Sequence, residues 1–462
     1  MKIQREGLLV PESLTPPVDL ELFESLQAAR LDKTATYTQL SITGERKEAA
    51  LVALRNGEDV DLTASHLDEE TLRERLLALR GWKKDLLAND AIDPDLKQVY
   101  RWRVNEDIAN VHLLEASRKG DMPRFRRWNE FIYDKPDEIV YRAALDWVAN
   151  DAEQLLAKPD QKPAIIEAAQ NVLSLIGNDR GYRELLIPED EVFQEIREDQ
   201  MQSGGYFEML LDGVELPSEG KITKELGNAA LQHIIVYNLK SDYGLRPSKT
   251  GDWSVNHAER FVEHPENYSL PLERFIGLPA GHEIGQHYLE YVNGMRADVR
   301  LLSRGLDRTE HGNESTALVR EMALYKTFAD FAKTVRWREI IRREVGIGFG
   351  YGVGDDEPRT TNEIYAFMNA IDTMYQAKLT PDDAEATAEK AHAKTGKYII
   401  RTLRGGSVYL KDKVYPEGHE TTWRTLAEKG PSALEDSTLG KYDINNSRHI
   451  QFLQNRGIVS KV

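Results

Sequence analysis

Apolar residues recur at three- and four-residue spacing through most of the first two hundred positions of this sequence. The pattern is clear over 19–31 (DLELFESLQAARL), 68–87 (DEETLRERLLALRGWKKDLL) and 163–176 (PAIIEAAQNVLSLI). Such spacing places the apolar side chains on one face of an α-helix. Asp68 precedes one of these runs as a helix-starting residue, and the prolines between 159 and 163 interrupt the pattern. We therefore predict a helical N-terminal lobe over residues 1–200.

The pattern changes in the second half of the chain. Residues 253–271 carry short β-branched runs between polar turns, which predicts a small β-sheet. Residues 230–239 fit a helix or a strand, and helical spacing resumes over about 272–345 and about 361–395. We interpret residues 201–462 as a mixed lobe. The predicted fold class is α+β, predominantly α.

Glycine occupies every second position of GIGFGYGVG, residues 346–354. This spacing matches neither the dinucleotide-binding GxGxxG pattern nor a phosphate-binding P-loop. We interpret the segment as a flexible connection between helices at the border of a cleft. Nucleotide binding is not predicted.

Composition narrows the class of protein. A chain of 462 residues exceeds the usual size of one hydrophobic core, and its 40% hydrophobic and 30% charged content is typical of soluble globular proteins. No apolar run is long enough to span a bilayer, and the N-terminus lacks the apolar core of a secretory signal. We therefore expect a cytoplasmic protein. Its oligomeric state is left open.

The formal net charge of -17 disfavours nucleic acid and anionic membranes as partners. Two local basic clusters alternate with acidic residues, and we interpret both as solvated helix faces. They comprise Arg118, Lys119, Arg124, Arg126 and Arg127 in the first, and Arg336, Arg338, Arg342 and Arg343 in the second. The chain has no cysteine, so a metal would have to be held by histidine and carboxylate.

Two of the eleven histidines fall in one phrase, His282-Glu283-Ile284-Gly285-Gln286-His287. A catalytic zinc site takes three protein ligands, commonly His and Glu, and leaves one position for water. A glutamate beside the first histidine can act on that water without binding the metal, as in the HExxH helix. The phrase therefore indicates a zinc peptidase site, and the alternative is a pair of histidines packed in a polar core.

The spacing of the two histidines predicts a distorted helix. Residues i and i+5 lie ~140° apart around a regular α-helix, against ~40° for i and i+4. A π-bulge between Glu283 and His287 would return both imidazoles to one face, and Gly285 supplies a permissive backbone. Pro279 suits a first helical turn, which predicts that the motif lies close to the helix start.

A third ligand is needed, and spacing alone does not choose it. The downstream candidates are Glu290, Glu310, His311, Glu314 and Glu321. Glu290 lies one turn beyond His287, where it suits a supporting partner of that histidine better than a ligand.

The chain resembles a family at this point: the bacterial flavohaemoglobin-expression-modulating QEGLA-motif proteins and their eukaryotic relatives, the microtubule-associated tyrosine carboxypeptidases. The resemblance rests on residues 282–287 with the following 291–294 (YVNG) and 301–306 (LLSRGL), and on 132–137 (IYDKPD) and 401–418. It spans roughly residues 100 to 460 and carries the glutamate of the signature onto Glu314. Asn313, Ser315 and Thr316 depart from the Gln, Gly and Leu of that signature.

The resemblance implies a mostly helical, gluzincin-like metallopeptidase with a small sheet beside the metal helix. In this interpretation His282, His287 and Glu314 hold Zn²⁺ and Glu283 is the catalytic acid-base. The expected activity is that of a carboxypeptidase acting on the C-terminal tail of a peptide or protein. The acidic tail of tubulin is not carried over, because a body of net charge -17 would not attract it.

A carboxypeptidase must also bind a terminal carboxylate, for which Arg or Lys is the natural partner. The candidates are Arg401, Arg404 and Lys411, and Tyr415 could donate a hydrogen bond to substrate. Two alternatives stay open: an endopeptidase or aminopeptidase on the same zinc site, and a non-catalytic zinc-binding regulatory protein. The two exopeptidase classes differ in the free terminus that they require: an aminopeptidase needs a free N-terminus and a carboxypeptidase needs a free C-terminus. A fourth protein ligand on the metal would favour the regulatory protein.

Overall fold

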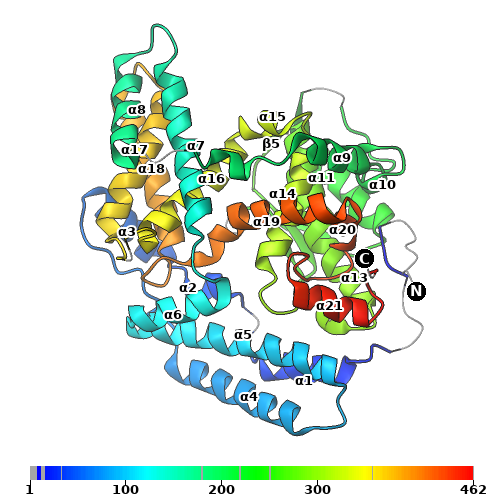
Figure 1. The fold of residues 1–462 in the computed structure, drawn as a ribbon. Helices are drawn as coiled ribbons and strands as arrows, with labels where there is room; N and C mark the ends of the chain where they lie inside the picture. The colour runs from blue at the N-terminus through cyan, green and yellow to red at the C-terminus, as the bar shows by residue number, and fades with distance from the viewer. Residues whose placement is uncertain are drawn as a thin grey trace.

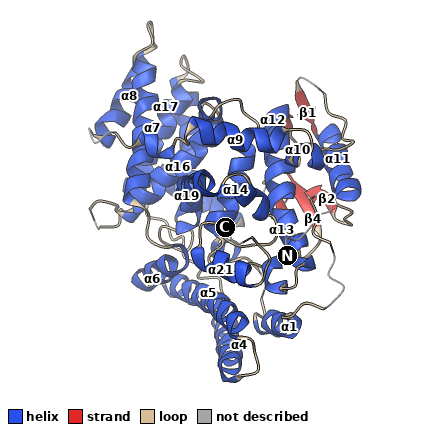
Figure 2. Cartoon of the chain, turned by 45° about the vertical axis from the view of Figure 1, so that its right-hand side comes forward, coloured by secondary structure: helices blue, strands red, loops and turns tan. Residues whose placement is uncertain are grey.

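The computed structural model describes residues 8–11, 16–32, 34–177, 181–217, 220–248, 251–355 and 357–460. Helices dominate these residues, with five short strands, so the prediction of a predominantly helical chain with a little sheet is confirmed. Figure 2 shows the strands gathered at one side of a helical body. Among the described residues, no helix combines the length and the apolar character needed to cross a bilayer.

A long helical arm forms the lower edge of the molecule in Figure 1. It consists of α1 (Leu20–Ala29), α2 (Thr36–Leu40), α4 (Glu69–Ala88), α5 (Pro94–Lys119) and α6 (Met122–Tyr133). Side chains start several of these helices: Asp68 accepts from the amide of Thr71, and Asp93 accepts from that of Leu96 before the Pro94 start. The capping chemistry predicted at Asp68 is therefore confirmed.

A second helical group stands at the upper left of the same view. It contains α3 (Gly44–Arg55), α7 (Glu138–Leu156), α8 (Pro163–Ile176), α17 (Thr361–Ala377) and α18 (Ala384–Thr402). Here α8 packs on both α7 and α17, and α18 packs on α17 and α3. Segments separated by some two hundred residues thus share one layer of helices.

The centre and right of the molecule hold the remaining elements. The central helices are α14 (Glu310–Met322), α15 (Phe328–Ala332), α16 (Val335–Tyr351), α19 (Val414–Lys429), α20 (Ser432–Asp436) and α21 (Ser447–Asn455), beside α9 (Asp190–Met201), α10 (Tyr206–Leu210) and α11 (Lys224–His233). Residues 230–239, whose sequence pattern fits a helix or a strand, are helical up to Asn238: they form the last turn of α11 and the π-helix η2 (Ile234–Asn238) that continues it. The described residues also contain three 3₁₀ turns, η1 (Arg183–Leu186), η4 (Arg300–Ser303) and η5 (Leu410–Lys413).

The strands form two small sheets. In one, β4 (Phe261–His264) pairs in parallel with β2 (Gly244–Pro247) and antiparallel with β3 (Ser254–Asn256). In the other, β1 (Lys221–Thr223) pairs antiparallel with β5 (Ser269–Pro271). The sheet strands predicted within 253–271 are confirmed as β3, β4 and β5.

Buried apolar side chains form two clusters that do not follow the chain as single blocks. The larger cluster draws on residues 10–196 and 297–459. The smaller one draws on Leu8, Leu9, residues 206–289 and Ala323. The division into lobes at residue 200 stays a prediction.

The glycine-rich segment 346–354 belongs largely to α16, so the prediction of a flexible connection was wrong. A Cβ atom at Gly346 would overlap Tyr398, and one at Gly348 would overlap Tyr141. The glycines therefore let large side chains of neighbouring helices approach the backbone. The helix ends at Gly352, whose φ of 82° is a left-handed C-cap.

Replacing Gly348 with Ala should destabilise the protein, because the added methyl group meets the ring of Tyr141 inside the packed core. Overpacking of this kind costs about 1–3 kcal/mol of the free energy of unfolding, measured by urea denaturation. The control is Gly81→Ala on exposed α4, where nothing lies within 4 Å of the added Cβ. That change should stabilise the helix by about 0.5–1 kcal/mol. Equal effects at both positions would contradict the packing account.

Candidate metal centre

The helix that carries the motif is distorted as the spacing predicted. This helix begins as α12 (Leu272–Phe275), continues as the π-helix η3 (Ile276–Tyr288) and ends as α13 (Leu289–Arg296). The small sheet packs beside it through β3. A Cβ atom at Gly285 would overlap the hydroxyl of Tyr206, so this glycine also permits the close approach of α10.

Pro279 does not mark the start of this helix, which corrects the prediction from its position. The helix begins at Leu272, and Pro279 lies inside η3. In an α-helix a proline ring clashes with the carbonyl group four residues earlier. The wider π-helical turn relieves that clash, so the proline is tolerated in the helix interior.

Three side chains meet at the inner face of η3. The Nε2 atom of His282 lies 3.6 Å from Oε2 of Glu314, and the Nε2 atom of His287 lies 3.8 Å from the same oxygen. Ligand atoms of a tetrahedral zinc site with bonds of about 2.05 Å stand roughly 3.4 Å apart. Among the described residues, these three form the only group of His, Asp and Glu side chains placed to share a metal ion.

The surroundings of Glu314 support a cation at this position. Its Oε2 atom is buried and accepts no hydrogen bond among the described residues. Burial acts to raise the pKa of Glu314, but the adjacent imidazoles of His282 and His287 outweigh it and hold that pKa well below its usual range. A buried, charged oxygen facing two imidazole nitrogens is a donor set that zinc accepts. The residues therefore fit the metal.

The outer nitrogens of both histidines face carboxylates. His282 Nδ1 lies 2.7 Å from Oε1 of Glu321, and His287 Nδ1 lies 3.8 Å from Oε2 of Glu290. Glu321 in turn accepts hydrogen bonds from Arg336 Nε and Nη2, at 3.1 and 2.8 Å. A carboxylate bound to Nδ1 fixes the tautomer that leaves Nε2 free for a metal. The 2.7 Å approach of Glu321 to His282 is short enough for this, whereas the 3.8 Å approach of Glu290 to His287 is not a hydrogen bond.

Glu321→Gln should weaken zinc binding, because the amide removes the negative charge that orients His282 and increases its basicity. Loss of such an outer partner typically lowers metal affinity by about 10- to 100-fold. Competition with a chromophoric chelator measures the affinity, and Glu195→Gln on the exposed face of α9 is the matched control. An affinity equal to that of the control would show that Glu321 does not support the ligand.

Glu283 is buried beside the first histidine, only 9% exposed. Burial raises the pKa of its carboxyl group, and the nearby His282 and His287 act in the opposite direction. A carboxylate with a raised pKa can both accept and return a proton near neutral pH. The raised pKa of Glu283 is the direction of shift that an acid-base role requires.

The second basic cluster is not a solvated face, which corrects its interpretation. Arg336 binds Glu321, Arg342 forms a buried pair with Asp372 (Nε to Oδ1, 2.8 Å), and the guanidinium of Arg343 lies 4.8 Å from the ring centroid of Tyr415. These arginines lie on α16, which packs against helices on several sides. Alternating charges along the sequence cannot distinguish such internal pairs from a solvated surface. In the first cluster, Arg118 and Lys119 pair with Glu69 at the surface.

The four predicted substrate-binding residues fall into two groups. Arg401 pairs with both oxygens of Asp412, at 2.6 and 2.9 Å, and Arg404 donates to the carbonyl oxygen of Arg401 at 2.7 Å. Lys411 pairs at 3.0 Å with Glu310, which lies one helical turn before Glu314 on α14. Burial first, and then the charge of Glu314, raise the pKa of Tyr415. The roles of all four toward substrate stay predictions.

Two features of the site had no signal in the sequence pattern. Glu321 was one candidate ligand among five. Its place behind His282 follows from its contact with Nδ1 of that histidine, and Arg336 holds it there. Arg304 lies in residues 301–306, which stand out in the sequence only through the family resemblance. A search against protein-family models, curated proteins and solved structures finds no match.

Proposed function

We propose that this protein is a zinc-dependent peptidase of the carboxypeptidase type. The observation that carries the proposal is the convergence of His282, His287 and Glu314 on one point, with the buried Glu283 beside it. The resemblance to the QEGLA-motif family supports it further. As part of the proposal, the π-helical His-Glu-x-x-x-His segment and the later glutamate on a second helix make the catalytic half gluzincin-like.

The chemistry divides between metal and protein. Zinc, when bound, supplies a Lewis acid and lowers the pKa of water toward ~7. Glu283 accepts the proton of the attacking water and returns it to the departing amine. Glu321 holds the imidazole of His282 in position, and in this proposal the hydroxyl of Tyr415 donates a hydrogen bond to the substrate.

The test combines metal content with product analysis. The protein purified with zinc should contain one equivalent, and it should shorten peptides with a free C-terminus by one residue, as read by mass. Peptides with a blocked N-terminus should be trimmed equally well, and C-amidated peptides should not. A chelator should abolish the activity, and added zinc should restore it.

Other outcomes identify the alternatives. Internal cleavage of doubly blocked peptides would establish an endopeptidase, and a requirement for a free N-terminus would establish an aminopeptidase. Stoichiometric zinc without cleavage of any peptide would favour a non-catalytic zinc-binding regulatory protein. Absence of zinc binding would leave both histidines as packed core residues.

A further inference from the structure

A cavity of about 290 Å³ opens between the helical arm and the start of α14. One of its walls comes from α1, α2, α4 and α5, and the opposite wall comes from η4, α14 and the segments near 409–411 and 441. Glu310, which lines it, lies one helical turn before the ligand Glu314 on α14. The three proposed ligands do not line the cavity themselves, and α14 is the element that the cavity shares with the proposed zinc site.

The lining carries more cations than anions, unlike the protein as a whole. Its basic residues are Arg30, Arg75, Arg103, Arg304, Lys411 and Lys441. Its acidic residues are Asp32, Glu106, Asp107 and Glu310. A polar cavity with this excess of positive charge favours an anionic ligand.

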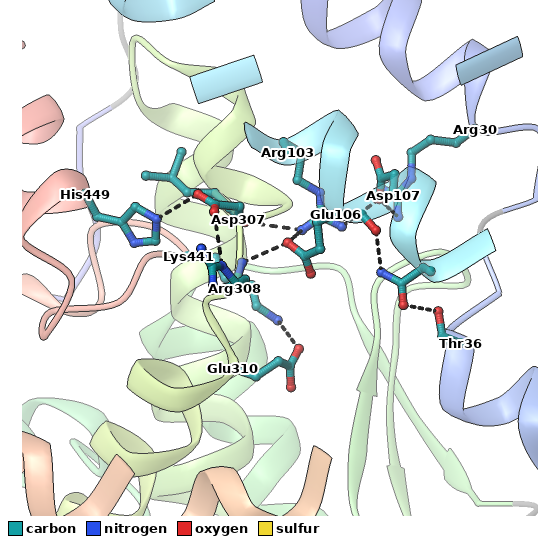
Figure 3. A network of polar contacts seen from close by, with 12 residues as sticks. Arg30, Thr36, Arg103, Glu106, Asp107, Asp307, Arg308, Glu310, Lys441 and His449 are labelled. Carbon is teal, nitrogen blue, oxygen red and sulfur yellow. Dashed lines mark hydrogen bonds and ion pairs between the residues drawn. The ribbon is translucent and has the colours of Figure 1, made fainter. Parts of the chain in front are cut away.

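The charges far from the metal are balanced. Arg30 and Arg103 both pair with Asp107, at 3.4 and 2.9 Å, and Arg103 also contacts Glu106 at 3.5 Å. Figure 3 shows this network, in which the backbone amide of Arg308 also donates to Glu106. These groups satisfy one another and tie the helical arm to the loop before α14.

The unbalanced charge lies at the metal end. Lys411 and Lys441 share one carboxylate, Glu310, at 3.0 and 3.8 Å. The guanidinium of Arg304 makes no ion pair with any described residue. Arg75 pairs with Asp32 at 3.3 Å, so Glu310 is the one lining acid that remains against these three cations.

Arg304 is held toward the metal helix. It follows η4, and its guanidinium lies 5.8 Å from the ring centroid of Tyr291. Tyr291 is on α13, four residues after His287 and so on the same helix face. His257 stacks on the ring of Tyr291, with centroids 4.0 Å apart. The Nδ1 atom of His257 lies 3.2 Å from the hydroxyl of Tyr243.

We propose that Arg304, together with Lys441, binds the terminal carboxylate of a peptide substrate in this cavity. The inference deepens the proposed carboxypeptidase function and rests on it. The guanidinium has no ion-pair partner in the described part of the chain, and its planar shape suits a bidentate contact with carboxylate. Arg401 and Arg404 are less suited, since the first is paired with Asp412 and the second donates to main-chain oxygens.

Binding measured without turnover tests the assignment. The zinc-loaded Glu283→Gln protein is titrated by calorimetry with N-acetyl-tetra-alanine and with its C-terminal amide. The free acid should bind more tightly than the amide by about 10- to 100-fold, the range of a charge-assisted hydrogen-bonded pair. Adding Arg304→Gln should remove that difference while zinc content stays at one equivalent. Arg101→Gln, an exposed arginine of α5, removes the same charge elsewhere and should leave the difference intact.

The outcomes separate this inference from the function on which it rests. An acid-over-amide preference that survives in the Arg304→Gln protein, or that is missing before the change, overturns the role of Arg304. A preference that depends on Arg304, in a protein whose parent cleaves no peptide, supports the carboxylate site and rejects the peptidase. Trimming by the parent with an unchanged preference in the variant leaves the peptidase and removes Arg304 from it.

Discussion

Glu283→Gln should reduce peptide hydrolysis by roughly 10²- to 10⁴-fold while the protein keeps its zinc. The amide has nearly the shape of the carboxylate but cannot accept the proton of the attacking water. Glu283 is not one of the three side chains that converge as ligands, so the metal should stay bound. The change in kcat on a trimmed peptide, measured beside zinc content, checks both parts.

The control for this variant is its stability to urea, which shows whether the protein is still folded. Glu283 is buried with a raised pKa, so a neutral amide should leave the midpoint of urea denaturation near that of the parent or slightly above it. Turnover retained at the parental level, with full zinc, would exclude Glu283 as the proton carrier. Loss of zinc together with activity would instead make Glu283 a ligand.

Glu314→Ala should abolish stoichiometric zinc binding. Among the described residues, the change removes the one carboxylate that lies within 4 Å of both imidazoles, at 3.6 and 3.8 Å. We expect an affinity loss greater than the ~100-fold upper range for outer partners such as Glu321. A ligand at 100 times its dissociation constant stabilises the folded state by about 2.7 kcal/mol. Free zinc at about 100 times the parental dissociation constant should therefore raise the unfolding free energy of the parent by about 2.7 kcal/mol and that of the variant very little.

Glu314→His is the matched variant, because it returns a nitrogen donor to the same position on α14. It should recover part of the zinc-dependent stabilisation that Glu314→Ala loses. Equal stabilisation of the parent and the Glu314→Ala protein by zinc would place the metal elsewhere.

The local geometry of the metal helix could be predicted from the sequence, because it depends on residues close together in the chain. The five-residue step from His282 to His287 requires a π-helical distortion if both imidazoles are to share a face, and η3 provides it. The third ligand could not be chosen by spacing. Glu314 was selected by resemblance, and the structure brings it together with the two histidines.

Features that depend on distant segments could not be predicted. Alternating glycines in 346–354 suggest a loop, but Tyr141 and Tyr398 lie against them only because α7 and α18 pack on α16. The same holds for the basic run of α16, where Asp372 and Glu321 partner its arginines from other helices. The cavity is a further case, since its walls come from residues 27–37, 75–133 and 304–441.

The proposed ligands belong to two different packing units. Ile284 and Tyr288 place the metal helix in the smaller apolar cluster, whereas Leu318 and Val319 place the helix of Glu314 in the larger one. Metal affinity is therefore thermodynamically linked to the contact between the clusters, and by reciprocity each stabilises the other by the same free energy. Zinc affinity therefore reports on the contact between the two clusters: a substitution at Arg320, which donates to Gln286 on the metal helix and to Gln200 on α9, should weaken zinc binding as it loosens that contact.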